Sequence, residues 1–142
     1  MKIDSHHHFW KYDPETYSWM NDKMEILKQD YLPEDLHKNI MEAEIDGVVS
    51  VQADQSLRET EDLLHYAEKN DFILGVVGWL PLADPDVEEV MNSYTNQELL
   101  KGIRHVVQDE PNNHFILGEK FNEGVSLLKK FGWVYDILIY ER

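Results

Sequence analysis

Two histidines near the start of the sequence, His6 and His8, have the residue type and spacing to do chemistry. They lie in the segment MKIDSHHHFW, residues 1–10. In a β-strand successive side chains point to opposite faces, so His6 and His8 share one face while His7 points to the other. Two imidazoles on one face can converge on one metal ion or on one polar group of a substrate. We therefore interpret this strand as the carrier of a functional site at its carboxyl end.

Two simpler interpretations of these histidines stay open at the level of sequence. One is a purification tag, although the three histidines lie within an apolar strand pattern and no linker follows them. The second is ordinary core or surface histidines, because an isolated His-x-His pair carries no chemistry by itself. The polar residues at the ends of later strands favour a functional site over both.

The elements that would position the histidines alternate between strand and helix along the chain. Helices are predicted to begin at Pro33, Ser56 and Asp84 and near Leu117, and the last one to end near Gly132. The start at Ser56 is marked by the capping pattern Ser56-x-x-Glu59. The later strands are predicted at residues 48–53, 72–80, 102–107 and 134–140. Strict alternation of this kind favours parallel strands joined by right-handed helical crossovers.

Several polar side chains fall at or near the carboxyl ends of these strands, where parallel α/β folds place their sites. Beyond the first strand they are Gln52, Trp79, Arg104, His105 and Asp136. Asp136 lies inside an otherwise apolar strand, and a buried carboxylate needs a partner or a function. His105 would point away from Arg104, so we interpret it as structural. No phosphate-binding glycine motif follows any strand, which favours part of a (β/α)8 barrel over a nucleotide-binding doubly wound sheet.

Composition narrows the class of protein further. The 142 residues include 42% hydrophobic residues, enough for the core of one domain. Lys and Arg number 13 against 28 Asp and Glu, and the formal net charge of −15 argues against nucleic acids and anionic membranes as partners. The sequence has no cysteine and no long apolar run, so we predict a soluble, cytoplasmic protein.

With these residues identified, the sequence resembles the amidohydrolase-2 family and, within it, the sugar-lactone hydrolases of the L-fuconolactonase and L-rhamnono-lactonase type. Six segments carry the resemblance, in order: IDSHHHFW (3–10), YDPETYSWM (12–20), DGVVSVQADQSLRET (46–60), GVVGWLPLADPDV (75–87), KGIRHVVQDEP (101–111) and VYDILI (134–139). The resemblance therefore runs along essentially the whole chain.

The resemblance implies the N-terminal portion, about five β/α units, of a (β/α)8 barrel whose site lies at the carboxyl ends of the strands. It implies hydrolysis of the ester-type C–O bond of a lactone, with His6 and His8 as the catalytic residues. In the wider superfamily this pair binds a divalent metal, zinc above all, whereas some members of this branch work without one. Substrate contacts are implied for the residues at the later strand ends: Gln52, Trp79, Arg104 and Asp136.

The sequence departs from the family in length. A complete barrel takes about 250 residues, and the family's later histidine and its general-base aspartate have no counterpart in these 142 residues. We therefore predict a single partial barrel domain, residues 1–142, that lacks the C-terminal strands and is inactive alone. Its expected partners are a lactone substrate and either further copies of itself or a complementing half-barrel. Two alternatives stay open: another metal-dependent hydrolase or decarboxylase on the same barrel, and a non-catalytic half-barrel.

Overall fold

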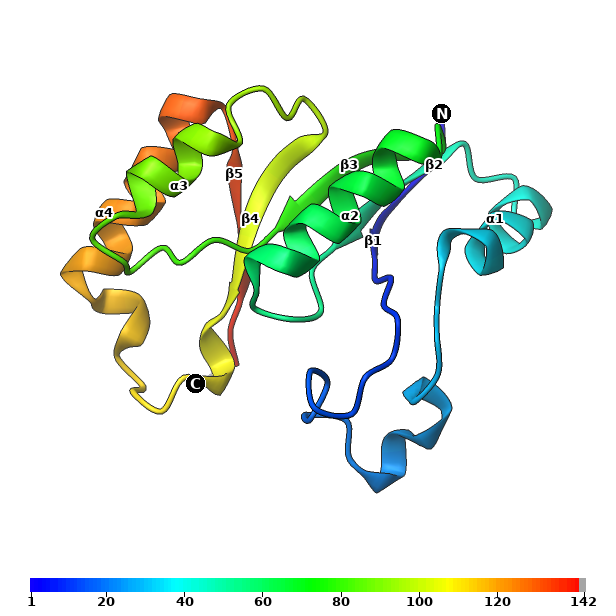
Figure 1. The fold of residues 1–142 in the computed structure, drawn as a ribbon, viewed down its shortest axis with the longest axis horizontal. Coiled ribbons are helices and arrows are strands. Elements are labelled where there is room, and N and C mark those ends of the chain that lie inside the picture. The colour runs from blue at the N-terminus through cyan, green and yellow to red at the C-terminus, as the bar shows by residue number, and fades with distance from the viewer. Residues whose placement is uncertain (141–142) are drawn as a thin grey trace.

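The computed structural model describes residues 1–140, which form one curled sheet of parallel strands with helices between them (Figure 1). The strands are β1 (Ile3–His7), β2 (Gly47–Val51), β3 (Ile73–Gly78), β4 (Leu100–Val106) and β5 (Val134–Leu138). They lie side by side in chain order, and every neighbouring pair is parallel. Sequential order is the arrangement of a (β/α)8 barrel, because a doubly wound sheet reverses its strand order partway.

Each pair of consecutive strands is joined by one helix. The helices are α1 (Pro33–Glu42), α2 (Leu57–Lys69), α3 (Val87–Ser93) and α4 (Glu119–Phe131), with short 3-10 turns at η1 (Asp22–Leu27), η2 (Val107–Asp109) and η3 (Phe115–Leu117). Long helical crossovers are what parallel strands require. Among the helices of residues 1–140, none combines the length and apolar character that crossing a membrane would take.

Several predicted boundaries differ from the structure, each by a few residues. β2 and β3 each end two residues earlier than predicted, and β4 begins two residues earlier. The third helix begins at Val87 and not at Asp84, because the Asp84 carboxylate and carbonyl accept from Asp86 N and Val87 N and fold these residues into a turn. Leu117 belongs to η3, and α4 starts two residues later. The fifth strand ends at Leu138. Gly132 does end α4, with the left-handed backbone (φ 73°) that glycine adopts without strain.

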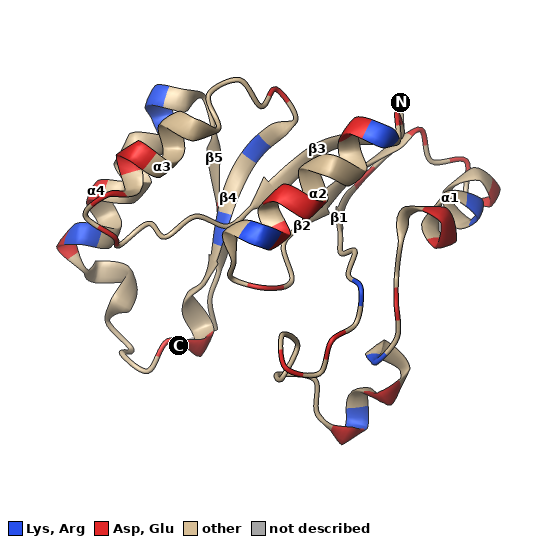
Figure 2. Cartoon of the chain, viewed as in Figure 1, with Lys and Arg blue, Asp and Glu red and all other residues tan. Residues whose placement is uncertain are grey.

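The main core lies between the sheet and the helices that cover one of its faces (Figure 1). Val48 on β2, Val76 on β3 and Ile103 on β4 have no exposed surface and pack with Leu63 of α2 and Met91 of α3. β3 is covered on both faces, and residues 72–80 (FILGVVGWL) form the nearly continuous apolar run that is typical of such a strand. Charged side chains lie mainly on the helices and loops, and the strands carry few of them (Figure 2). This packing fixes the strand ends that carry the polar residues.

The two longest connections from a strand to the next α-helix, residues 8–32 and 107–118, extend beyond the carboxyl ends of β1 and β4 (Figure 1). The segment after β1 is organised by Trp10, whose ring packs with Tyr17 and Met20 in a second, smaller core. Trp10 Nε1 donates to two carbonyl oxygens of the same segment, and Trp10 and Tyr31 form a backbone bridge. The chain therefore returns from its first loop to α1 along a defined path beside the end of β1.

Candidate active site

The histidine pair lies where β1 ends. His6 Nε2 and His8 Nε2 are 3.3 Å apart, and His8 Nδ1 is 2.8 Å from the carbonyl oxygen of Val51. Because a carbonyl oxygen only accepts, His8 Nδ1 carries the proton and its Nε2 presents a lone pair to His6. Burial lowers the pKa of His8, and the nearby Arg104 guanidinium lowers it further, so this ring is neutral at pH 7. The backbone of β2 thus fixes the orientation of one imidazole.

Arg104 on β4 reaches across the sheet to the same pair. Its Nη1 lies 3.2 Å from His6 Nε2, and its Nη2 donates to the carbonyl oxygen of Gln52. A guanidinium only donates, so His6 Nε2 accepts from Arg104; because His8 Nε2 is also unprotonated, no proton then lies between the two histidine nitrogens. A proton or a cation between the two nitrogens would stabilise this arrangement. Arg104 is 5% exposed, and burial lowers its pKa while Asp136 and Glu59 act to raise it.

Gln52 completes the group from the end of β2. It is fully buried, and its Nε2 donates to the carbonyl oxygen of Arg104 at 3.4 Å. Its Oε1 and the Nε of Arg104 have no hydrogen-bond partner within the described part of the chain. Buried polar atoms are nearly always paired, so an unpaired acceptor and an unpaired donor on two residues whose side chains donate to each other's carbonyl groups suit a polar ligand. This pair of atoms is the clearest sign of a binding site at the strand ends.

Asp136 lies on the same face as Arg104, because the two residues are direct partners in the parallel ladder between β4 and β5. It is half-buried and does not form an ion pair with Arg104. The guanidinium instead contacts His6 and Gln52. The Asp136 carboxylate therefore interacts with Arg104 by electrostatic attraction without a direct contact, and this attraction raises the pKa of Arg104. The carboxylate is therefore available to a ligand.

Trp79 and His105 belong to a separate group of contacts. Trp79 Nε1 donates to His105 Nδ1 at 3.2 Å, and His105 Nε2 donates to Glu110 Oε1 at 2.6 Å. The His105 ring stacks on Phe115, with the ring centres 4.8 Å apart. His105 therefore points away from Arg104, as alternation along the strand requires. The indole N–H of Trp79 is engaged by His105, which leaves only its ring face for a ligand.

Glu59 is a residue whose role the sequence indicated only in part. Ser56 Oγ accepts from Glu59 N at 3.2 Å, which is half of the predicted capping box. The Glu59 carboxylate, however, turns to the loop after β2 and accepts from Ala53 N and Asp54 N. The S-x-x-E spacing was the one signal for this residue, and it does not reveal which N–H groups the carboxylate takes.

The contact of Glu59 with Ala53 links it to the candidate site. A single peptide group bridges two charged side chains: its N–H, on Ala53, faces Glu59, and its C=O, on Gln52, faces Arg104. The peptide dipole is favourably oriented between an anion and a cation. Burial raises the pKa of Glu59 to about 7, although the backbone N–H groups and Arg104 act to lower it.

The separation of the histidine pair fits a divalent metal, which would take the lone pair of His6 Nε2 that accepts from Arg104 in this structure. Zinc binds imidazole nitrogens at about 2.0–2.1 Å, and a tetrahedral angle then places two of them about 3.3 Å apart. This is the separation between His6 Nε2 and His8 Nε2. The carbonyl of Val51 holds the other nitrogen of His8, as outer partners of metal-bound histidines do. Within residues 1–140 no cluster of three or more His, Cys, Asp or Glu side chains could hold a metal, so a metal at this place would have His6 and His8 alone as ligands from this half.

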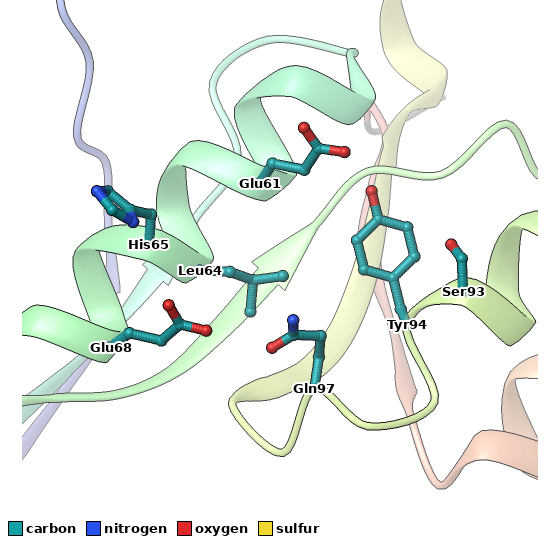
Figure 3. Close-up of a pocket in the computed structure, with 7 residues that line it drawn as sticks. All are labelled: Glu61, Leu64, His65, Glu68, Ser93, Tyr94 and Gln97. Atoms are coloured by element: carbon teal, nitrogen blue, oxygen red, sulfur yellow. The ribbon is translucent and has the colours of Figure 1, made fainter.

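Two hollows lie elsewhere on the molecule. One, of about 750 Å³, separates the loop after β1 from the start of α2. The other, of about 400 Å³, lies on the helical side, where Glu61, His65 and Glu68 of α2 face Tyr94 and Gln97 (Figure 3). The linings of both hollows lack the histidine pair and Arg104, and exposed acidic side chains on a helix are normally solvated. The residues at the strand ends therefore remain the better candidate site.

Comparisons with known proteins give matches along nearly the whole chain. A sequence model of the amidohydrolase family matches residues 3–140. A Burkholderia multivorans protein named L-fucono-1,5-lactonase is 36% identical over 143 residues, which cover 100% of this chain and 48% of that protein. A Burkholderia ambifaria protein of the same name is 25% identical, with 99% of this chain and 49% of that protein covered.

The fold is shared with solved structures. A crystal structure of a Burkholderia multivorans amidohydrolase with bound zinc matches with a TM-score of 0.93 and 35% identity, over 99% of this chain and 49% of that one. A probable 2-pyrone-4,6-dicarboxylic acid hydrolase from Acinetobacter baumannii has the same fold at a TM-score of 0.65 and 12% identity, over 94% of this chain and 48% of that one. The structure is thus a curled half-barrel of the amidohydrolase type, which confirms the predicted fold class.

The family follows from the same matches. The chain belongs to the amidohydrolase family, because the family model covers nearly all of it. It spans about half the length of the curated relatives that it matches.

Proposed function

We propose that this chain carries one half of the active site of a lactone hydrolase, which opens a sugar-derived lactone by attack of water on the carbonyl carbon. The observation that supports this most is the convergence of His6, His8 and Arg104 at the carboxyl ends of β1 and β4. The name of the Burkholderia multivorans relative, L-fucono-1,5-lactonase, supports the choice of a sugar lactone.

The reaction makes three demands on the site. Water loses a proton and adds to the carbonyl carbon, and the carbonyl electrons move to oxygen to give a tetrahedral oxyanion. The ring C–O bond then breaks, and the ring oxygen takes a proton and leaves as the hydroxyl of a hydroxy acid. The site must therefore accept the proton of the water, stabilise the oxyanion and supply a proton to the ring oxygen.

The residues at the strand ends stabilise the oxyanion and bind the substrate. Arg104 presents guanidinium hydrogens in a water-poor environment, where they stabilise negative charge on a carbonyl oxygen more strongly than in water. Gln52 Oε1 accepts from a substrate hydroxyl, because it has no protein partner within residues 1–140. Asp136 binds a second hydroxyl. Trp79, which contacts His105 and not Arg104, is left at most a contact of its ring face with the far end of the sugar.

His6 and His8 supply the electrophile on the other side of the carbonyl. As metal ligands they would hold a zinc ion, which when bound polarises a carbonyl and acidifies a water molecule. If the site works without metal, the Arg104 guanidinium, 3.2 Å from His6 Nε2, supplies the positive charge, because His8 is neutral at pH 7.

We propose that the chain alone is inactive and that residues 1–142 are one incomplete barrel domain. Residues 1–140 offer two metal-ligating histidines and no third ligand. A catalytic zinc site takes three protein ligands, and the proton of the attacking water needs a base at a suitable distance. The missing groups would come from the later strands of the barrel.

A chimera tests this proposal. The 142 residues replace the matching half of the Burkholderia multivorans relative, and hydrolysis of L-fucono-1,5-lactone and of L-rhamnono-lactone is followed by acid release at constant pH. We expect the chimera to hydrolyse at least one lactone and the isolated chain to hydrolyse neither. A folded chimera without activity on either lactone would contradict the proposal.

Matched histidine variants locate the activity. We expect His6→Ala and His8→Ala, each made in the chimera, to lower the kcat of the chimera at least about a hundredfold. This is the usual size of an acid–base or electrophilic contribution. The control is His65→Ala, an exposed histidine on α2 that should leave kcat unchanged. Removal of metal with a chelator, followed by return of zinc, distinguishes a metal-held site from a metal-free one.

A further inference from the structure

The backbone at the end of β2 orients two side chains of the candidate site. Val51 is the last residue of β2, and its carbonyl oxygen lies 2.8 Å from His8 Nδ1. The next carbonyl oxygen, that of Gln52, accepts from Arg104 Nη2. Two consecutive carbonyl groups of the chain thus bind one imidazole and one guanidinium. The direction of the Gln52 carbonyl therefore decides where the Arg104 side chain lies.

The peptide group between Gln52 and Ala53 lies just beyond the part of the chain that the sheet holds. Gln52 N donates to the carbonyl oxygen of Val77 at 2.9 Å, and this bond ends the ladder with β3. The carbonyl of the next peptide group faces Arg104, and its N–H donates to both carboxylate oxygens of Glu59 at 3.1 Å. Such a peptide group can turn by changes in the two soft dihedral angles beside it. Its orientation therefore depends on the two side chains that bind it.

Glu59 binds this part of the backbone from the first turn of α2. Its side chain is buried, with 6% of its surface exposed, and its carboxylate also accepts from Asp54 N. Burying a carboxylate costs free energy unless hydrogen bonds compensate it, and these N–H groups provide the compensation. The other charged or titratable groups that act on it are the Asp54 carboxylate, the Tyr17 hydroxyl and the Arg104 guanidinium. Of these, Arg104 is the cation, so the anion and the cation attract each other across the peptide group.

We propose that Glu59 is a positioning residue of the candidate active site. Its carboxylate fixes the peptide group after Gln52, and the carbonyl of this group keeps Arg104 directed at His6. With Nη2 bound by that carbonyl, Nη1 of Arg104 lies 3.2 Å from His6 Nε2. The inference rests on the proposed function, in which Arg104 stabilises the oxyanion. Glu59 acts on the reaction through the backbone and Arg104.

A purely structural role is the alternative for Glu59. In that role the carboxylate only closes the loop after β2 over the start of α2, and its loss lowers stability without moving Arg104. The substitution Glu59→Gln separates the two roles. It keeps the shape of the side chain but replaces one carboxylate oxygen by an NH2 group, a donor that cannot accept from Ala53 N. The peptide group then loses part of its hold, and the Arg104 guanidinium gains freedom to rotate.

The first test follows the Arg104 guanidinium in the 142-residue chain by carbon–nitrogen NMR correlation at pH 8, above the Glu59 pKa of about 7. The sequence contains three arginines, and Arg104→Lys identifies the Arg104 signals. Because Nη1 and Nη2 have different acceptors, we expect two separate Nη signals in the wild type. We expect Glu59→Gln to bring these signals closer together and Glu59→Ala to merge them.

The control is Glu68→Gln, an exposed position on the same helix, which should leave the Arg104 signals unchanged. Circular dichroism establishes which variants are folded. Should Glu59→Ala fail to fold, the isosteric Glu59→Gln decides the outcome. A folded Glu59→Gln variant with the wild-type Arg104 signals would overturn the proposal.

The second test measures catalysis by the active chimera. We expect Glu59→Gln to lower kcat at least about tenfold, because Arg104 acts on the charge that develops in the transition state. KM should change less than about threefold, since the bound lactone itself carries no such charge. An active chimera in which Glu59→Gln leaves kcat unchanged would overturn the catalytic part of the proposal. A wild-type chimera without activity contradicts the lactone proposal instead, and the NMR spectra still decide whether Glu59 positions Arg104.

Discussion

β3 and β5 are similar in sequence and opposite in environment. Both are apolar strands of the kind found inside parallel sheets. β3 lies at the centre, where Ile73 is 2% exposed and Val76 has no exposed surface, whereas Ile137 on β5 is 62% exposed. An apolar composition thus shows that a strand is suited to burial, but the neighbouring strands and helices decide whether the strand is buried. The exposed apolar side chains of β5 reflect its place at the edge of the sheet that residues 1–140 form.

The largest expected effect comes from truncating the same residue type in the two strands. Ile73→Ala removes a buried side chain and leaves a cavity, so we expect it to lower the free energy of unfolding by about 2–5 kcal/mol. Ile137→Ala should cost less than about 1 kcal/mol, because the side chain is largely in water. Urea unfolding of both variants measures the difference. Equal losses would mean that β5 is covered in solution, by self-association or otherwise.

The buried carboxyl group of Glu59 shows how burial affects a polar side chain. Because burial raises the pKa of Glu59 from 4.5 to about 7, the folded state binds the proton more tightly than the unfolded state. The stability that this proton contributes is fully present below about pH 4.5 and is lost as the pH rises through 7. Over this window the free energy of unfolding should fall by at most about 3 kcal/mol through this group.

Glu59→Gln isolates that contribution. We expect the free energy of unfolding of the wild type, minus that of the variant, to decrease from pH 5 to pH 8. Chemical denaturation at several pH values gives both terms. Glu68→Gln, at an exposed position on the same helix, controls for the loss of one negative charge. A pH-independent difference between wild type and Glu59→Gln would show that Glu59 is ionised throughout.

A glycine tests how closely the helical side is packed. A Cβ on Gly124 of α4 would overlap the carbonyl oxygen of Leu82, which belongs to the backbone after β3. We expect Gly124→Ala to lower the free energy of unfolding by about 1–3 kcal/mol, the usual cost of overpacking. Glu123→Ala, at the exposed neighbouring position, should be close to neutral. Thermal unfolding followed by circular dichroism compares them, and a neutral Gly124→Ala would mean that α4 shifts freely.

The smallest effect is expected at the surface of α2. Arg58 faces Asp62 one turn along, with 3.9 Å between the nearest charged atoms, and its side chain is 91% exposed. Such pairs contribute about 0.3–0.5 kcal/mol because water and salt screen them. Arg58→Ala should therefore change the urea midpoint only slightly at low salt and not detectably at about 1 M salt, where the screening length falls to about 3 Å. A loss above about 1 kcal/mol would assign Arg58 a role beyond this pair.

Much of the fold could be predicted from the sequence, since strand and helix have different periods and each strand was followed by a helical pattern. The boundaries were less accurate where short-range hydrogen bonds compete with helix formation, as at Asp84. The shared face of His6 and His8 follows from alternation along one strand, and their Nε2 atoms do meet. His105 also points away from Arg104, for the same reason.

Other features of the site depended on long-range contacts. The contact between Arg104 and His6 joins residues 98 positions apart, and no local pattern contains it. The Glu59 carboxylate takes Ala53 N and Asp54 N in place of the cap N–H, because the loop after β2 folds back over the start of α2. The indole N–H of Trp79 is taken by His105, which only the packing of two neighbouring strands brings within reach.

The sequence by itself determined the alternation of strands and helices, the parallel sheet and the sharing of a face by the two histidines, because these depend on residues a few positions apart. The tertiary structure decided which polar side chains contact one another at the strand ends. It also decided that the apolar side chains of β5 are exposed. Those outcomes depend on the order and curvature of strands that are distant in the chain. Burial in particular depends on a strand together with its neighbours, as the exposed apolar side chains of β5 show.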